Sequence, residues 1–484
     1  MQHNNPFTYG NPVPPDQLIG RDDELFKIVE RINTGQSTAM TGSLCSGKTS
    51  ILEYLRAAEK QTELYGDNTN QLIFYYLDAS TLEPTYNKVQ FWNDALKPLI
   101  DCINTQNSSS PLESNLLETY QICQEKQFGG YEFEKLIAQI RKMNWQLVLM
   151  IDEFDMLLHH PILNSTEFFG GLRSRVSLSK GALTLVLASN IPLSQLNEGT
   201  QHFNPTGSPY FNFMSDIILG PLQNTQINKL LQPGETYFTE DDYRFIKNIA
   251  GGYPYLLQVA ASILWEMYEK GFEKDSVKRQ QRVKQAFYDQ IAENTLKKMW
   301  QRWTEETQND LTSVILAYLE QQQILVTQPI EINKLPEIQI GKWIAEKHTP
   351  LLKELRLYGF VAQDSSNDWR GFPNIFLDFV RENQLRVSDD KQPDEKSHVI
   401  IREDDDILEK LFSPTFLIVM FIGTIVGERL GHLILTTHFG LSQTFSGTDS
   451  LSVLIFKFVL AALGAFLGYK IAKWFKTKPS YSGT

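Results

Sequence analysis

The sequence contains few cysteines. Only three occur, Cys45, Cys102 and Cys123, and none of them forms a pair with the short spacing of a metal or disulfide site. The composition therefore predicts neither a disulfide framework nor a zinc site, as in an intracellular protein. Cys45 is interpreted as a small loop residue, with a redox-sensitive thiol as the alternative. Residues 1–15 also lack the basic start and apolar stretch of a secretory signal.

Positive charge is also scarce. There are 45 Lys and Arg residues against 57 Asp and Glu residues, which gives a formal net charge of -12. A chain of this charge is as a whole a poor binder of polyanions, so we expect partners that are not selected by positive charge. The 484 residues are too many for one hydrophobic core, and we expect several domains.

A phosphate-binding loop is the strongest pattern present. Residues 42–49 read Gly-Ser-Leu-Cys-Ser-Gly-Lys-Thr and match the pattern Gly-x-x-x-x-Gly-Lys-Thr at every defining position. In this pattern backbone N–H groups surround the phosphates, Lys48 adds charge at the β- and γ-phosphates, and the Thr49 hydroxyl is suited to ligate Mg²⁺. A strand expected at Ser37–Thr41 and a helix expected from Ser50 support this reading. The residues expected to contact ATP are Gly42, Ser43, Leu44, Cys45, Ser46, Gly47, Lys48, Thr49 and Ser50.

A second pattern, of the Walker B type, indicates hydrolysis. Residues 145–151 form an apolar run typical of a buried parallel strand, and Asp152 and Glu153 follow it. We expect Asp152 to hold Mg²⁺, directly or through water, and Glu153 to orient and polarise the attacking water. The alternative for such carboxylates is a helix cap. Asp155 is expected to be a cap or to support its neighbours.

Three further runs predict the rest of a parallel sheet. Leu72–Asp78, Leu183–Asn190 and Asp216–Leu219 are β-rich and are separated by helical or polar stretches, which indicates crossover connections. Asn190 stands at the end of its run, where its side chain would sense the γ-phosphate and position water. The alternative is an Asn that forms a turn at the strand end.

Two motifs resemble those of a known family. Residues 19–25 read Ile-Gly-Arg-Asp-Asp-Glu-Leu and precede the phosphate-binding loop, and residues 251–258 read Gly-Gly-Tyr-Pro-Tyr-Leu-Leu-Gln. Together with the segment from Asn5, they resemble the AAA-like ATPases of bacteria and archaea that are related to origin-recognition ATPases and to the STAND signalling NTPases. The resemblance covers about residues 5–385. It implies that Gly20 and Arg21 contact the nucleotide and that Pro254 contacts the base from a helical lid.

Read without the resemblance, the lid motif predicts a helix C-cap at its two glycines and Pro254 at the first position of the next helix. The chain also departs from hexameric AAA+ proteins, because residues 191–221 contain no Arg or Lys to serve as an arginine finger. Arg173 and Arg175 are the remaining candidates, with solvated helix charges as the alternative. The lid also lacks a convincing sensor arginine near Pro254, which favours a slow switch over a processive motor.

Beyond the lid the pattern predicts a winged-helix module. Asp310–Gln322 reads as a helix, Ile340–Tyr358 as a helix or helix pair, and Gly359–Arg370 as a strand, a polar turn and a return strand. Origin-type relatives use such a module on DNA, whereas STAND relatives use it to hold the ATPase closed. Since acidic residues slightly outnumber basic ones in residues 302–386, we favour the second use over nucleic-acid binding.

The last part of the chain predicts a membrane hairpin. Thr415–Thr436 and Leu451–Trp474 are long enough to cross about 30 Å of hydrocarbon. The loop at 437–450 has no Lys or Arg, whereas lysines follow the second run, so both termini are expected in the cytoplasm and the chain in the inner membrane. Glu428 and Lys457 lie inside these runs, as a structural ion pair or as part of a polar seam.

The sequence thus predicts an α/β fold, a P-loop NTPase with a parallel sheet, a helical lid, a winged-helix module and a transmembrane helical hairpin. The expected function is a membrane-anchored, Mg²⁺-dependent ATP switch for signalling or a membrane effector output, with antiviral defence suggested by family analogy. The alternatives are a membrane-tethered DNA-binding ATPase and a remodelling ATPase. The expected partners are ATP, the membrane, further copies of the chain and an unidentified protein trigger. The domains are predicted at residues 1–222, 223–300, 301–386, 387–412 and 413–476.

Overall fold

The computed structural model describes residues 4–389, apart from residues 106–109, 204, 206, 272–274, 324–343, 345–347 and 364–367. Both predicted membrane spans, and most of the predicted charged linker, lie outside the described residues. Within the described part, no helix is both long enough and apolar enough to cross a bilayer.

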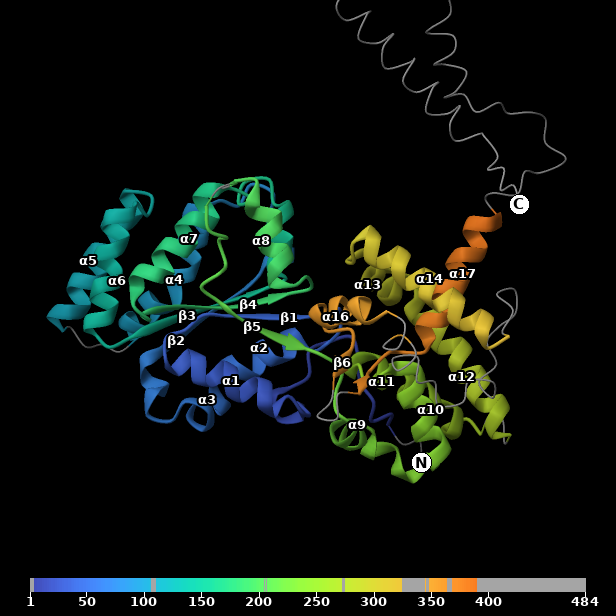
Figure 1. Cartoon of the computed structure of the whole chain (residues 1–484). Coiled ribbons are helices and arrows are strands. Elements are labelled where there is room, and N and C mark those ends of the chain that lie inside the picture. Colours follow the sequence, from blue (N-terminus) through green and yellow to red (C-terminus); the bar gives the residue numbers. More distant parts are fainter. Residues whose placement is uncertain are drawn as a thin grey trace, which may run out of the picture. The chain divides into compact units, whose positions relative to one another are not determined.

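A parallel sheet of five strands organises the N-terminal half of the described chain (Figure 1). Its order is β2-β3-β4-β1-β5, and each neighbouring pair is parallel, as the crossover pattern predicts. The inner strands β1, β3 and β4 are buried almost throughout, which explains their nearly continuous apolar runs. The strands are β1 (Thr38–Gly42), β2 (Leu72–Asp78), β3 (Gln146–Asp152), β4 (Leu183–Ser189) and β5 (Ser215–Leu219).

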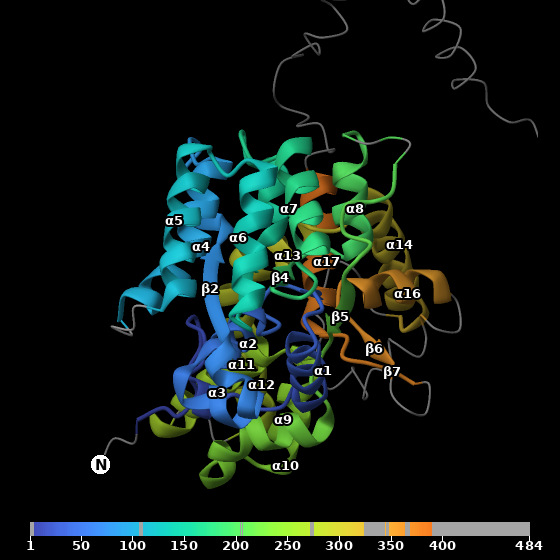
Figure 2. The same cartoon turned by 90° about the vertical axis from the view of Figure 1, so that its left-hand side faces the viewer.

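Helices cover both faces of this sheet (Figures 1 and 2). Side chains of β3 alternate between the faces: Leu149 and Ile151 pack with α4 to α8, whereas Val148 and Met150 pack with α1 to α3. The first face carries α4 (Lys88–Thr105), α5 (Pro111–Glu125), α6 (Gly130–Lys142), α7 (Thr166–Ser179) and α8 (Leu193–Gln201). The second face carries α1 (Asp22–Asn33), α2 (Lys48–Arg56) and α3 (Ala58–Tyr65).

Helices and one short hairpin follow the sheet. Strands β6 and β7 pair antiparallel, which confirms the predicted strand and return strand; the predicted turn at 364–367 lies outside the described residues. Helix α14 begins earlier than predicted, because the Thr304 hydroxyl caps it by accepting a hydrogen bond from the N–H of Thr307. The elements are α9 (Asn224–Leu231), α10 (Glu240–Ala250), α11 (Pro254–Glu269), α12 (Ser276–Ile291), a π-helical turn (Ala292–Leu296), α13 (Lys297–Gln301), α14 (Glu305–Gln321), α16 (Thr349–Leu357), β6 (Ala362–Gln363), β7 (Trp369–Arg370) and α17 (Ile375–Asp389).

The predicted lid and the predicted module that follows it share one hydrophobic cluster. Rings from both sides of the predicted boundary meet in it, because the Tyr253 ring lies 5.8 Å from that of Phe360 and the Trp300 ring lies 6.2 Å from that of Phe376. Leu257 on α11 and Ile315 on α14 belong to the same cluster. The boundary between 300 and 301 stays a prediction, but among the described residues the buried side chains on its two sides belong to one cluster. Helix α17 also continues to Asp389, past the predicted boundary at 386.

A glycine marks the contact between this cluster and the sheet. Gly359 has a φ of +68°, and a Cβ added there would lie 2.4 Å from the carbonyl oxygen of Leu219 and 3.2 Å from Cα of Gly42. The Tyr253 hydroxyl donates to the Gly359 carbonyl oxygen at 3.1 Å. The chain after α16 therefore passes directly behind the start of the phosphate-binding loop, where no side chain fits.

Candidate nucleotide-binding and hydrolysis site

The phosphate-binding loop connects β1 to α2 by a tight turn. Gly47 precedes the helix with a φ of +95°, and Cys45 has a φ of +63°. A Cβ added at Gly42 would lie 2.8 Å from Oγ of Ser46, so this first glycine is required for the loop to close. The Ser46 hydroxyl is buried and has no hydrogen-bond partner in the described part of the chain. Such an atom beside a helix N-terminus fits a loop that receives phosphate oxygens.

Cys45 does not have the environment of a redox-sensitive thiol. Burial raises the pKa of its thiol to about 11, although the Lys48 ammonium acts in the opposite direction. The thiol is therefore protonated at neutral pH, whereas reactive cysteines are thiolates. The structure favours the interpretation of Cys45 as a small loop residue.

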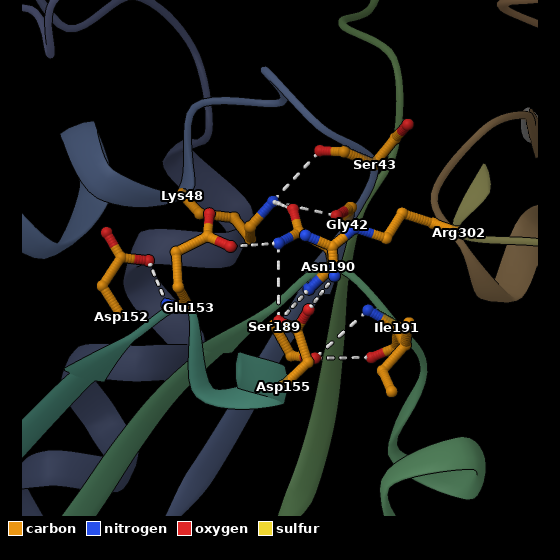
Figure 3. Close-up of polar contacts among 10 residues, drawn as sticks. All are labelled: Gly42, Ser43, Lys48, Asp152, Glu153, Asp155, Ser189, Asn190, Ile191 and Arg302. Carbon is orange, nitrogen blue, oxygen red and sulfur yellow. Dashed lines mark hydrogen bonds and ion pairs between the residues drawn. The ribbon is translucent and has the colours of Figure 1, made fainter. Parts of the chain in front are cut away.

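Lys48 lies buried at the centre of the site (Figure 3). Its ammonium donates to the carbonyl oxygens of Gly42 at 2.9 Å and Ser43 at 3.1 Å, and to Oδ1 of Asn190 at 2.9 Å. Burial lowers the pKa of Lys48, and the nearby carboxylates, of which Glu153 has the largest effect, raise it. The ammonium is thus held between the loop and the carboxyl end of β4, where a phosphate charge would be stabilised.

The residues predicted to bind magnesium lie together. The Thr49 hydroxyl donates to Oδ2 of Asp152 at 2.6 Å, and the Tyr76 hydroxyl donates to the same oxygen at 3.3 Å. The described residues contain no group of three or more His, Cys, Asp or Glu side chains that would hold a metal ion. Mg²⁺ at a phosphate site typically takes one or two protein carboxylates, with the other ligands from phosphate and water. Thr49 and Asp152 would supply the protein's oxygen ligands.

Asn190 joins Lys48 to Glu153. Its amide oxygen accepts from Lys48, and its amide nitrogen donates to a carboxylate oxygen of Glu153. Glu153 follows β3 in a left-handed conformation with a φ of +49°, which turns its backbone sharply at the strand end. Burial raises the pKa of Glu153, and Asp155 and Asp152 add to this, whereas Lys48 opposes it. The structure therefore brings together the side chains predicted to bind phosphate and to activate water.

A cavity of about 320 Å³ lies beside the phosphate-binding loop. Arg21 and Pro254, both predicted to contact nucleotide, line it, and Pro254 is also the first residue of α11, as predicted. Arg21 is only 4% exposed, and its guanidinium donates to the Ser46 carbonyl oxygen at 3.1 Å. Gly20 does not line the cavity. With a φ of +76°, it packs against the side chain of Gln226.

The remaining walls of this cavity come from distant parts of the chain. They include the N-terminal segment around Thr8–Val13, the loop residues Leu44–Ser50, and Tyr255 and Gln258 on α11. A cavity that lies between a phosphate-binding loop and an apolar helix end suits a base and ribose attached to the bound phosphates.

Comparison with known proteins agrees with this site. A family model described as "AAA-like domain" matches residues 34–358, more than half of the chain. The chain belongs to the AAA-like domain family. No curated protein matches it.

Solved structures similar to this AAA-like protein include the Walker-type ATPase Paby2304 of Pyrococcus abyssi. The two share 13% identity over 78% of this chain and 99% of the other, with a TM-score of 0.46. The Aeropyrum pernix ORC2 protein shows 14% identity over 79% of this chain and 98% of the other, with a TM-score of 0.44. Domain III of the replication initiation protein DnaA of Thermotoga maritima shows 14% identity over 58% of this chain and 98% of the other, with a TM-score of 0.33.

The two arginine-finger candidates of this AAA-like protein lie on α7. Arg173 donates to the carbonyl oxygens of Ser208 and Pro209, both at 3.1 Å. A finger acts on a neighbouring subunit's nucleotide, so its catalytic role stays a prediction. Arg175 lies over the rings of Phe133 and Trp92 and donates to a carbonyl oxygen, which makes it a packing residue rather than a solvated charge.

A different arginine, which sequence reasoning missed, approaches the site. Arg302 follows α13 and forms a 2.6 Å ion pair with Asp155. The same carboxylate accepts a hydrogen bond from the backbone N–H of Asn190, which confirms the supporting position expected of Asp155. Asp155 and Arg302 are separated by 147 positions in the sequence, and no motif connects them. The one available signal was an arginine in the connection between the predicted lid and module, which could pair with the acidic residue three positions after Asp152.

Proposed function

We propose that this protein binds ATP with Mg²⁺, hydrolyses it slowly and acts as a nucleotide-dependent switch. The observation that supports this most is the meeting of Lys48, Asp152, Glu153 and Asn190 at the carboxyl ends of β3 and β4, beside the phosphate-binding loop. Ligands of open α/β sheets bind at this edge. ATP is the proposed nucleotide because the resemblance to AAA-like ATPases implies it, and its base would bind in the adjoining cavity lined by Arg21 and Pro254.

The proposed roles follow from position and charge. Lys48 and the loop N–H groups bind the phosphates, and Thr49 and Asp152 hold Mg²⁺, which offsets phosphate charge when it is bound. Glu153 accepts a hydrogen bond from water and orients it for in-line attack, and Asn190 holds the Glu153 carboxylate in place. A carboxylate whose pKa is raised by burial is also a stronger proton acceptor than an ordinary Glu.

Two substitutions test whether binding and hydrolysis separate. Glu153→Gln keeps the size of the side chain and its hydrogen bond to Asn190 but removes the basic carboxylate, so we expect ATP turnover to fall about 10²- to 10⁴-fold while binding is retained. Lys48→Ala is expected to weaken binding itself. Phosphate release and titration with a fluorescent ATP analogue measure the two effects. Equal hydrolysis rates for wild type and Glu153→Gln would remove Glu153 from the mechanism.

The finer part of the proposal concerns the output. Slow hydrolysis suits a signalling switch, and the apolar runs Thr415–Thr436 and Leu451–Trp474 support an inner-membrane hairpin with both termini in the cytoplasm. We infer that nucleotide state reaches this hairpin through the lid and the module, whose shared cluster would move as one body. Antiviral defence is the biological setting that the STAND resemblance suggests.

Replacing residues 413–476 by an unrelated two-span anchor tests the membrane output. We expect ATP hydrolysis to be kept and ATP-dependent membrane permeability or toxicity to be lost. If the chimera keeps the output of the native chain, the hairpin is only a tether.

A further inference from the structure

The carboxylate of Asp155 connects two parts of the molecule. One oxygen, Oδ1, accepts from the backbone N–H of Asn190 at 3.0 Å, and Oδ2 accepts from Nη1 of Arg302 at 2.6 Å (Figure 3). Asp155 is 2% exposed, whereas the Arg302 side chain is 31% exposed. The carboxylate is thus buried at the carboxyl edge of the sheet, whereas the arginine that pairs with it follows α13 and is partly exposed.

Asn190 also contacts two residues that we propose to act in ATP hydrolysis, Lys48 and Glu153. Its side-chain nitrogen also lies 3.4 Å from Oδ1 of Asp155 and donates to Glu153, while its oxygen accepts from Lys48. A chain of polar contacts therefore runs from Arg302 through Asp155 and Asn190 to the phosphate-binding lysine. Networks of this kind couple their members more strongly than isolated pairs do.

The Arg302 end leads into the shared cluster of lid and module. Trp303, the next residue, packs its ring against Phe360 and Phe376, and its carbonyl oxygen accepts from the side chain of Gln308 on α14. The backbone at Arg302 is therefore fixed to this cluster rather than to the sheet. An open cavity of about 470 Å³ borders the ion pair, so the guanidinium has room to separate from Asp155.

We propose that Arg302 is a positioning residue for ATP turnover: by pairing with Asp155 it holds the Asn190 amide between Lys48 and Glu153, so that hydrolysis depends on the docking of residues 297–303 against the sheet. The inference rests on the proposed ATPase function. It adds a role for Arg302 and a dependence of hydrolysis on the docking of residues 297–303, neither of which that function alone requires. Exposed ion pairs contribute little to stability, but a buried carboxylate that loses its cation is strongly disfavoured. Without its cation the Asp155 carboxylate would rotate away from its present position, and Asn190 would lose its anchor.

The test compares two charge-removing substitutions in the full-length chain. Arg302→Gln is expected to lower kcat for ATP about tenfold with KM changed less than about threefold, within the range of coupling in one side-chain network. Lys298→Gln is the matched control, because Lys298 is exposed on α13 and borders the same cavity. It is expected to stay within about twofold of wild type. Equal kinetics for the two variants overturn the proposal.

A rescue experiment separates positioning from a general loss of structure. Asp155→Asn leaves one acceptor oxygen for two donors, so the new amide N–H opposes either the Arg302 guanidinium or the Asn190 N–H, and we expect kcat to fall. Adding Arg302→Gln supplies an acceptor for that amide, so the double variant should recover at least threefold over Asp155→Asn alone, about the coupling of neighbouring residues. Absence of any recovery counts against the ion pair as the working contact.

The conservative variant keeps the test decisive if Arg302→Gln folds poorly. Arg302→Lys retains the charge and one donor, and it is expected to keep most of the turnover; a loss equal to that of Arg302→Gln contradicts the proposal. Thermal unfolding of each variant identifies poor folding. Failure of the proposed function itself looks different, because wild type would then show no ATP hydrolysis at all.

Discussion

The sheet half of the molecule and the half that follows it bury their apolar side chains differently. Each face of the sheet has its own cluster, one with α4 to α8 and the other with α1 to α3. The predicted lid and module instead contribute to one common cluster, which includes α11, α14 and α17. A two-faced sheet gives a rigid edge for a nucleotide site, whereas a single shared core packs the predicted lid and module into one body.

Among the described residues, the contacts between the two halves are single polar or backbone contacts rather than a shared apolar core. They include the ion pair of Arg302 with Asp155, a hydrogen bond from Gln195 to the Tyr358 hydroxyl, and the close approach of Gly359 to Leu219. These contacts are local and involve single residues, whereas a packed core holds many side chains together at once. The comparison therefore places the expected motion at this junction and not within either half.

The largest expected effect is on the shared cluster. Trp303→Ala removes a buried ring that packs against Phe360 and Phe376, and we expect a loss of about 3–5 kcal/mol of unfolding free energy. Hydrogen exchange should show α11 and α14 losing protection together, while the sheet keeps its own. Leu149→Ala, a buried change within the sheet, should show the reverse pattern. If Trp303→Ala affects α14 but leaves α11 protected, lid and module are separate bodies.

A smaller effect is expected where the halves touch. Gly359→Ala adds a Cβ 2.4 Å from the Leu219 carbonyl oxygen at a φ of +68°, whereas Gly271→Ala adds one at a φ of +65° with nothing within 4 Å. Both variants lose about 1–2 kcal/mol for the left-handed backbone, so the excess loss in Gly359→Ala measures the contact. We expect that excess to be at least about 1 kcal/mol by chemical denaturation, together with weaker ATP binding. Equal losses would show that the halves do not meet at Gly359.

The smallest expected effect concerns the hydroxyl of Tyr358. Tyr358→Phe removes the acceptor of the Gln195 amide and should cost about 0.5–1.5 kcal/mol. The matched control is Tyr243→Phe, because the Tyr243 hydroxyl is buried without a hydrogen-bond partner in the described residues. Removing that hydroxyl should be neutral or stabilising. Denaturation midpoints compare the two, and a loss as large in Tyr243→Phe would leave no special role for the junction contact.

Much of the site was predictable because its parts are local in sequence. The phosphate-binding loop is one continuous segment, so Lys48 and Thr49 are recognised without a fold. Asp152 and Asn190 each end an apolar run, and parallel strands bring their carboxyl ends to one edge. The arginines were harder, because Arg175 has the spacing of a surface residue and yet lies against aromatic rings. Whether a helix charge meets water or an aromatic ring depends on neighbouring helices.

By itself, then, the sequence determined which runs form parallel strands, where the phosphate-binding loop lies and which carboxylates follow β3, since apolar runs and backbone turns act over a few residues. Only the tertiary structure decided that lid and module share one core, that Gly359 lies against the sheet, and that Arg302 reaches Asp155. Those contacts join residues far apart in the chain. They depend on packing rather than on any local pattern, because side chains of many types satisfy the same hydrophobic periodicity. Only the folded arrangement of the helices places the Arg302 cation beside the buried Asp155 carboxylate.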